Sequence, residues 1–152
     1  GLVAVALAHN SVEVWDWAGQ AHPLRIHRAQ GGDPCLLYHA RLWGRALGEL
    51  RVAAGTAFNQ VLVWSPGGGV DVLRLKGHWG VIFRVAWRED GMRLASASDD
   101  RTVRVWDEED RAAAGEEEGR DGGGRLVWTG WGHASRVWDV GFADLGVVSC
   151  GE

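Results

Sequence analysis

The sequence has few of the residues that cross-link or interrupt small folds. It contains two cysteines, Cys35 and Cys150, three prolines and one methionine among 152 residues. The cysteines fit neither a disulfide framework nor a zinc-ligand spacing, which favours a reducing compartment. We therefore expect a cytoplasmic protein without a bound metal. No apolar run reaches the about 18 residues that span a bilayer, so a membrane is not among the expected partners.

Acidic charge is concentrated in one segment of the chain. The formal net charge is −4, but residues 108–121 alone hold seven acids and two arginines. The rest of the chain is therefore nearly neutral, at +1. This segment runs into three glycines and has no apolar period, which predicts an exposed acidic, glycine-rich loop over residues 108–124. A tolerated insertion and an acidic docking segment are the two interpretations.

Tryptophan and glycine are abundant, with ten and 23 residues, and they occur in two repeated elements. The first element begins with Gly-His and places large apolar residues at every second position, which is the period of a β-strand. It occurs as GHWGVIFRVAW (77–87) and GHASRVWDVGF (132–142). The second element carries a tryptophan at its fifth position and occurs as SVEVWDW (11–17), QVLVWSP (60–66) and TVRVWDE (102–108).

Gly-His followed by Trp-Asp, repeated every ~40–45 residues, is the pattern of a WD-repeat β-propeller with four-stranded blades. The most regular repeat predicts strands at 81–87, 93–98, 102–107 and 125–129, and the one before it at 36–42, 50–56, 60–64 and 70–75. The N-terminus adds two strands of an earlier blade and the C-terminus two of a later one. We predict an all-β fold, an incomplete fan of about three to four blades from a longer protein. The blade pieces span 1–34, 35–76, 77–130 and 131–152.

One repeat carries a set of polar residues that resembles a catalytic triad. His78, Ser96, Asp100 and Trp106 are separated by 18, 4 and 6 residues, which matches the structural tetrad of WD repeats. A buried tryptophan N–H and both ring nitrogens of a buried histidine need hydrogen-bond partners, and these residue types supply them. We therefore expect a structural network and no enzyme. Nucleophilic catalysis by Ser96 would also require an exposed hydroxyl and oxyanion donors.

The tetrad is incomplete in the other repeats. Ten and six residues before Trp64 stand Ala54 and Phe58, so that blade has to be held by packing alone. The last repeat keeps His133 and Ser149 as a partial tetrad.

Several stretches are more specific than the general repeat and resemble the multi-propeller family of WD repeat-containing protein six. They are VALAHNSVEVWD (5–16), AGTAFNQVLVW (54–64), GHWGVIFRVAW (77–87), ASASDDRTVRVWD (95–107) and GHASRVWDV (132–140). This resemblance implies a non-catalytic scaffold that assists an FtsJ-type methyltransferase in 2′-O-methylation of the tRNA anticodon wobble nucleotide. It also implies that tRNA binds through the full-length protein and that S-adenosylmethionine is carried by the catalytic partner.

The residues of this chain agree with a cofactor-free role, because no glycine-rich cofactor fingerprint follows a strand. The alternative function is a general WD-repeat scaffold in kinase signalling or ubiquitin-ligase substrate recruitment, with kinases or adaptors as partners. In either case partner binding is expected at the rim formed by the loops before the first strand and between the second and third. The candidates there are Trp79, Asp99, Arg101, Ser135 and Arg136, with His9, Asn10 and Ala134 beside them.

Overall fold

The computed structural model describes residues 2–7, 11–16, 25–28, 37–65, 73–107 and 124–152. Within these ranges the regular elements are β-strands, apart from the 3-10 helix η1 (Leu47–Glu49). The predicted acidic loop 108–124 falls outside them except for Gly124, and so do His9, Asn10 and Cys35. No helix among the described residues is long and apolar enough to cross a membrane.

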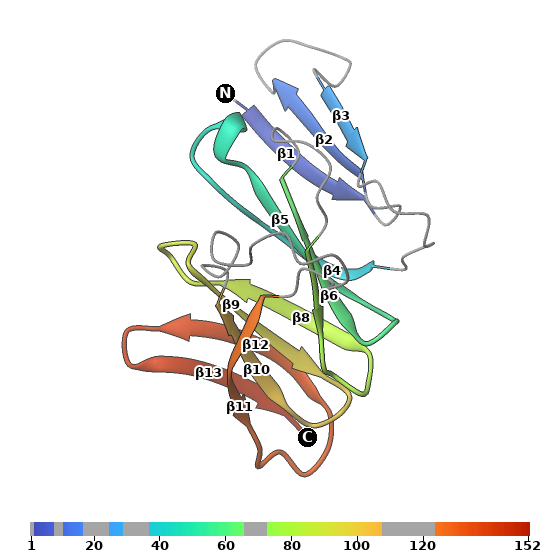
Figure 1. Ribbon diagram of the computed structural model, residues 1–152, viewed down its shortest axis with the longest axis vertical. Helices are drawn as coiled ribbons and strands as arrows, with labels where there is room; N and C mark the ends of the chain where they lie inside the picture. The colour runs from blue at the N-terminus through green and yellow to red at the C-terminus, as the bar shows by residue number, and fades with distance from the viewer. Residues whose placement is uncertain (1, 8–10, 17–24, 29–36, 66–72, 108–123) are drawn as a thin grey trace, which may run out of the picture.

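The strands form four antiparallel sheets that follow one another along the chain (Figure 1). In each sheet consecutive strands are hydrogen-bonded neighbours, so each sheet is an antiparallel meander. The N-terminal sheet contains β1 (Leu2–Leu7), β2 (Ser11–Asp16) and β3 (Arg25–Arg28). The second sheet contains β4 (Leu37–Trp43), β5 (Arg51–Thr56), β6 (Gln60–Trp64) and β7 (Leu73–Lys76). The third contains β8 (Ile82–Trp87), β9 (Arg93–Ser98), β10 (Val103–Asp107) and β11 (Arg125–Gly130), and the fourth contains β12 (Val137–Ala143) and β13 (Gly146–Gly151).

This arrangement confirms the predicted all-β fold of four-stranded sheets arranged as part of a fan. One strand was not anticipated. β3 pairs with β2 from Ser11 opposite Arg28 to Val14 opposite Arg25, although residues 25–28 show no clear apolar alternation. Its position depends on backbone pairing with β2, which a pattern of side chains does not reveal.

Both faces of the central strands of the second and third sheets are buried, because each of these two sheets packs between two neighbours. In β5, Val52 and Ala54 face a cluster shared with Val14 of the N-terminal sheet, whereas Ala53 between them faces the third sheet. β9 repeats this division, since Leu94 packs towards the second sheet and Ala95 towards the fourth. The two-residue period therefore supplies two separate cores from one strand.

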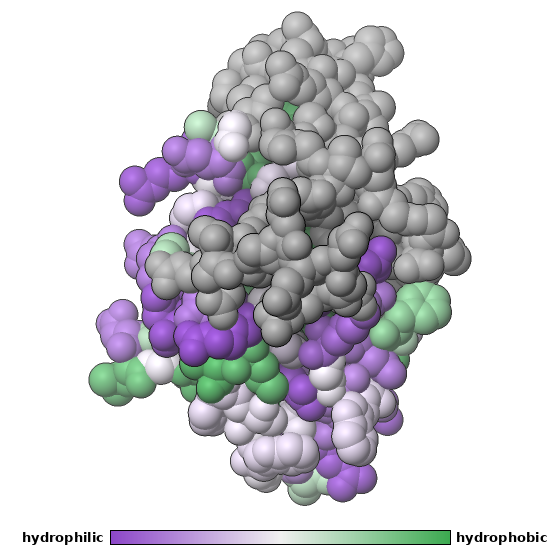
Figure 2. Space-filling model, in the orientation of Figure 1, coloured by the Kyte–Doolittle hydropathy of each residue, from purple (hydrophilic) through white to green (hydrophobic). Residues whose placement is uncertain are grey.

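The surface of the third and fourth sheets keeps several exposed apolar side chains, including Leu126, Val127 and Val148. Figure 2 shows hydrophobic residues next to hydrophilic ones in this part of the visible face. β13 pairs only with β12 among the described strands, so its second edge carries backbone groups that are open to a further strand.

The first strand of the second, third and fourth sheets carries a β-bulge at the same place. The pairing register shifts between Leu37 and His39 in β4, between Ile82 and Arg84 in β8 and between Val137 and Asp139 in β12. The extra residues are Tyr38, Phe83 and Trp138. Because a bulge redirects the side chain of its extra residue, these three aromatic rings leave the ordinary alternation of the sheets.

The glycines of the two Gly-His pairs are needed for the backbone conformation. Gly77 has φ +144° and Gly132 has φ +137°, a region that residues with a Cβ rarely occupy. A Cβ on Gly77 would also collide with the Arg104 guanidinium, whereas one on Gly132 would meet open space.

Replacing either glycine by alanine is therefore expected to lower the free energy of unfolding, but by different amounts. Gly132→Ala should lower the free energy of unfolding by ~1 kcal/mol through backbone strain, and Gly77→Ala by ~2–3 kcal/mol because Arg104 must also move. Chemical denaturation of both variants measures this order. An equal or larger loss for Gly132→Ala would contradict the role given to Arg104.

Candidate functional site

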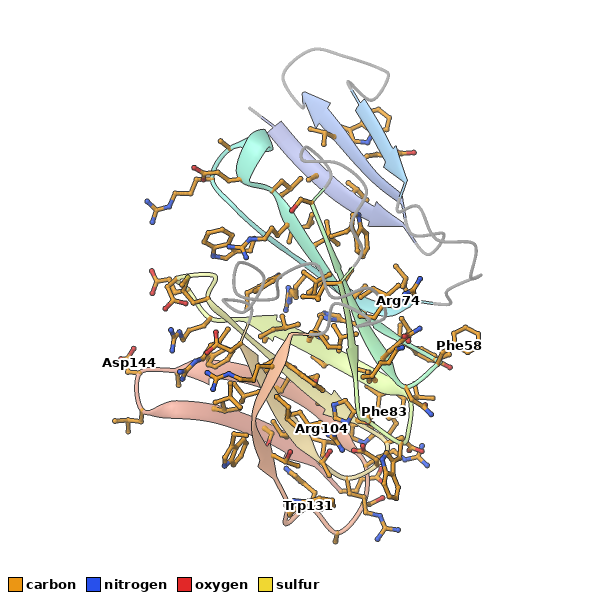
Figure 3. The ribbon with its side chains drawn as sticks, viewed as in Figure 1. Phe58, Arg74, Phe83, Arg104, Trp131 and Asp144 are labelled. Atoms are coloured by element: carbon orange, nitrogen blue, oxygen red, sulfur yellow. The ribbon has the colours of Figure 1, made fainter. Side chains whose placement is uncertain are left out.

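The structure joins His78, Ser96, Asp100 and Trp106 in one continuous chain of hydrogen bonds. His78 Nδ1 lies 2.8 Å from Asp100 Oδ2, and His78 Nε2 lies 2.7 Å from Ser96 Oγ. The indole N–H of Trp106 donates to Ser96 Oγ at 2.9 Å. The network thus links the loop before β8, strand β9, the turn between β9 and β10, and β10 itself. Figure 3 shows the side chains of this region as sticks.

The turn that carries Asp100 is fixed by further hydrogen bonds. Asp100 Oδ1 accepts from the hydroxyl of Thr102 at 2.6 Å and from its backbone N–H at 3.0 Å. Asp100 Oδ2 also accepts from the backbone N–H of Trp79 at 3.0 Å. Thr102 was not singled out from the sequence, although an aspartate that accepts from the backbone N–H two residues on is typical of such turns.

The hydrogen bonds assign the protonation state of the histidine. Ser96 Oγ accepts from Trp106, so its own hydrogen points to His78 Nε2, and the Nδ1–H of His78 donates to Asp100. Burial lowers the pKa of His78 and outweighs the opposing effect of the Asp100 carboxylate. Burial alone would raise the pKa of Asp100, but hydrogen bonds from His78, Thr102 and the Trp79 backbone hold it well below its usual range.

These hydrogen bonds tie the loop before β8 to the turn between β9 and β10. Ser96 is fully buried, and its hydroxyl is engaged on both sides, so no substrate atom can reach it. Among the described residues, no group of three or more His, Cys, Asp or Glu side chains could hold a metal ion. The network is therefore best explained as a set of mutually satisfied buried polar groups.

The second sheet has no such network at the corresponding positions. Ala54 occupies the place of Ser96, and the indole Nε1 of Trp64 is buried without a hydrogen-bond partner. Phe58, at the place of Asp100, is exposed on the turn between β5 and β6 (Figure 3). In the fourth sheet, His133 Nε2 lies 2.9 Å from Ser149 Oγ, and both residues are half-buried.

A second histidine lies on the first strand of the second sheet. His39 Nδ1 accepts a hydrogen bond from the backbone N–H of Val85 at 3.3 Å. Burial, together with the Arg84 and Arg41 cations, lowers the pKa of His39 from 6.5 to about 4, against a smaller raising effect of Asp139.

We expect the protein to lose stability as the pH falls below neutrality. The folded-state pKa values of His39 and His78 lie below 6.5, so the unfolded chain binds more protons there. The contribution is complete above pH 6.5 and is lost as the pH falls, for His39 towards about pH 4. Denaturation should show a loss of ~1 kcal/mol or more between about pH 7 and pH 5, reduced in His39→Gln. Equal stability at the two pH values would refute this linkage.

The candidate rim residues are close to the network but lie in different surroundings. Trp79 is 87% exposed, although its backbone is tied to Asp100. Asp99 and Arg136 connect the third and fourth sheets through an ion pair of 3.3 Å between Arg136 Nε and Asp99 Oδ1. Arg101 is exposed, with φ +68°, and the backbone N–H of Ser135 donates to the Glu152 carbonyl.

Comparisons with known proteins agree with this geometry. The family described as "WD domain, G-beta repeat" matches residues 69–107. The chain is 37% identical over its whole length to "tRNA (34-2'-O)-methyltransferase regulator WDR6" of Bos taurus, and 35% identical to the protein of that name in Homo sapiens. In both cases it spans 13% of the relative's length. A chain of the "Crystal Structure of Mitotic Checkpoint Complex" superposes with a TM-score of 0.68 at 21% identity, covering 99% of this chain and 40% of that one.

The repeated four-stranded sheets and the family match over residues 69–107 define a fold of the WD-repeat β-propeller class. Along its whole length the chain is similar to the tRNA (34-2'-O)-methyltransferase regulator WDR6.

Proposed function

We propose that this chain is part of a non-catalytic, cytoplasmic scaffold that assists 2′-O-methylation of the tRNA anticodon wobble nucleotide. In this proposal an FtsJ-type methyltransferase carries out the reaction, and the propeller supplies a docking face. The observation that carries the proposal is the 35–37% identity to the methyltransferase regulators across the whole chain. The buried state of Ser96 supports a role without catalysis.

The rim offers an anchor for a protein partner. The backbone of Trp79 is held by Asp100, which limits the entropy that the loop loses on binding, while its ring projects into solvent. Exposed tryptophans that become buried are frequent energetic centres of interfaces.

The test is a pull-down with the tagged full-length protein that contains this chain, together with deletion of its gene. An FtsJ-type methyltransferase should co-purify, and deletion should abolish wobble 2′-O-methylation. If methylation persists after deletion, the proposal fails. Capture of signalling kinases or ubiquitin-ligase components in place of the methyltransferase would instead support the general scaffold function.

A single substitution tests the anchor. Trp79→Ala should reduce capture of the methyltransferase about ten-fold or more with an unchanged melting temperature, because the ring contributes little to the fold. Leu145→Ala is the control, since Leu145 is fully exposed on the turn between β12 and β13, away from the loops that form the rim. Equal capture by the two variants would exclude Trp79 as the anchor.

A further inference from the structure

The first strands of the second and third sheets are joined by three hydrogen bonds with the same sequence offset. Each bond connects a residue of β4 with the residue 46 places later, in β8 or in the turn that follows it. The pairs are the Val85 N–H with His39 Nδ1 at 3.3 Å, the Trp87 indole N–H with the Arg41 carbonyl at 3.3 Å, and the Trp43 indole N–H with the Glu89 carbonyl at 2.9 Å. One tryptophan from each sheet therefore donates across the boundary between them.

The side chain of Arg51 contacts both of these tryptophan rings. Arg51 is the cross-strand neighbour of Trp43 within the second sheet, and its guanidinium carbon lies 4.7 Å from the centroid of the Trp43 ring. The same carbon lies 5.5 Å from the centroid of the Trp87 ring, which belongs to the third sheet. All three residues are half-buried, and partial removal from water strengthens the attraction between a cation and an aromatic face. We call Trp43, Arg51 and Trp87 the arginine clamp.

The turn of the third sheet that contacts Trp43 has its own hydrogen bonds. Arg88 Nε donates to Asp90 Oδ1 at 2.9 Å, and the backbone N–H of Gly91 donates to the Arg88 carbonyl at 2.9 Å. The Trp43 ring packs so closely on this turn that a Cβ on Gly91 would collide with it. The clamp therefore ends on a well-defined piece of backbone in the neighbouring sheet.

The clamp joins a sheet that lacks the hydrogen-bond network of the third sheet at the corresponding positions. It lies at the end opposite to Phe58, because β4 ends at Trp43 and β5 begins at Arg51, whereas Phe58 follows β5 (Figure 3). The clamp does not recur at the boundary between the third and fourth sheets. The residue opposite Trp87 is Leu94, which packs into the core and carries no charge.

We propose that the arginine clamp holds the second sheet to the third and limits their separation. The hydrogen-bond network of His78 connects parts of the third sheet only, so it cannot perform this task. A planar guanidinium can, because it stacks on aromatic faces from both sheets and stays charged. The rim combines the turn of Phe58 with the loop of Trp79, so the clamp also maintains the relative position of these two loops. This inference concerns the scaffold itself and holds for either class of partner.

The test is amide hydrogen exchange of the full chain, followed strand by strand. Arg51→Ala should speed the exchange of protected amides in β5 and β6 about ten-fold, because opening of the second sheet breaks both ring contacts of the cation. Exchange in β12 and β13 should be unchanged, since the fourth sheet can open without breaking the clamp. His78→Ala should speed exchange in β9 and β10 and leave β5 and β6 unchanged, which separates the clamp from the network.

Two further variants test the charge and the contact between the sheets. Arg51→Met keeps an apolar side chain without the cation, and it should speed exchange nearly as much as Arg51→Ala; it also replaces that variant in the comparison if Arg51→Ala does not fold. Arg51→Ala combined with Trp87→Leu should speed exchange by less than the product of the two single effects, because both substitutions remove the same contact.

Arg45→Ala is the matched control, because Arg45 is an exposed arginine in the loop between β4 and β5. It should exchange as the unchanged chain does. Equal exchange of β5 and β6 in Arg45→Ala and Arg51→Ala would overturn the proposal, and so would equal acceleration of the second and fourth sheets. Unchanged exchange in Arg51→Met would show that the charge is not needed. Single effects that multiply fully in the double variant would show that Arg51 and Trp87 do not act together across the boundary.

Discussion

Replacing Trp106 by alanine is expected to lower the free energy of unfolding by ~3–5 kcal/mol, the usual cost of deleting a buried tryptophan. Trp106 is almost fully buried and packs with Val85 and Leu94 in the core between the second and third sheets. Its removal would leave a cavity there, and Ser96 would lose the donor that orients its hydroxyl. Urea denaturation measures the loss, and a change below ~1 kcal/mol would contradict this account of the core.

A matched pair of milder variants separates the hydrogen bond from the packing. Trp106→Phe and Trp64→Phe both shorten a buried indole, but only the N–H of Trp106 has an acceptor. Trp106→Phe should therefore destabilise the protein more than Trp64→Phe, by about 1–2 kcal/mol. The opposite order would show that the hydrogen bond to Ser96 contributes nothing.

The second large effect is expected at His78. His78→Ala should lower the free energy of unfolding by ~1–3 kcal/mol, because it removes a donor to the Asp100 carboxylate and the acceptor of the Ser96 hydroxyl. Thr102 and the Trp79 backbone still donate to Asp100, which keeps the loss within this range. A thermal melting curve unchanged by the substitution would count against the network.

His133→Ala provides the control for this variant. His133 makes the corresponding hydrogen bond to Ser149, but both residues are only half-buried, so water can replace it at little cost. The loss should be below ~1 kcal/mol. In addition, Ser96→Ala combined with His78→Ala should cost less than the sum of the single variants, because the two side chains share one hydrogen bond.

The sequence predicts the parts of this fold that depend on residue type and spacing. The repeated pattern places β8, β9 and β10 within about one residue of their observed bounds, because apolar or small residues fill the buried positions of these strands. The positions of His78, Ser96, Asp100 and Trp106 follow from the need of buried polar groups for partners, and the structure brings the four together.

Features that depend on backbone pairing or on distant neighbours do not follow from the sequence. Phe83 and Trp138 occupy ordinary apolar positions in the repeat, and nothing in the pattern shows that a bulge redirects their rings towards each other. The ion pair between Arg136 and Asp99 joins two sheets, so it depends on how the sheets are placed side by side. Thr102 is an intermediate case. Its hydrogen bond to Asp100 is local, but many turns have a similar sequence, so the sequence alone does not single it out.

The unpartnered indole of Trp64 has a consequence for the order in which the sheets open. The second sheet relies on side-chain packing at positions where the third sheet also has the hydrogen-bond network. Local opening of the second sheet should therefore require less free energy. Amide protons of β5 and β6 should then exchange with solvent before those of β9 and β10. Transient opening of a sheet would expose the apolar faces of its neighbours. Misassembly between chains should therefore begin at the second sheet.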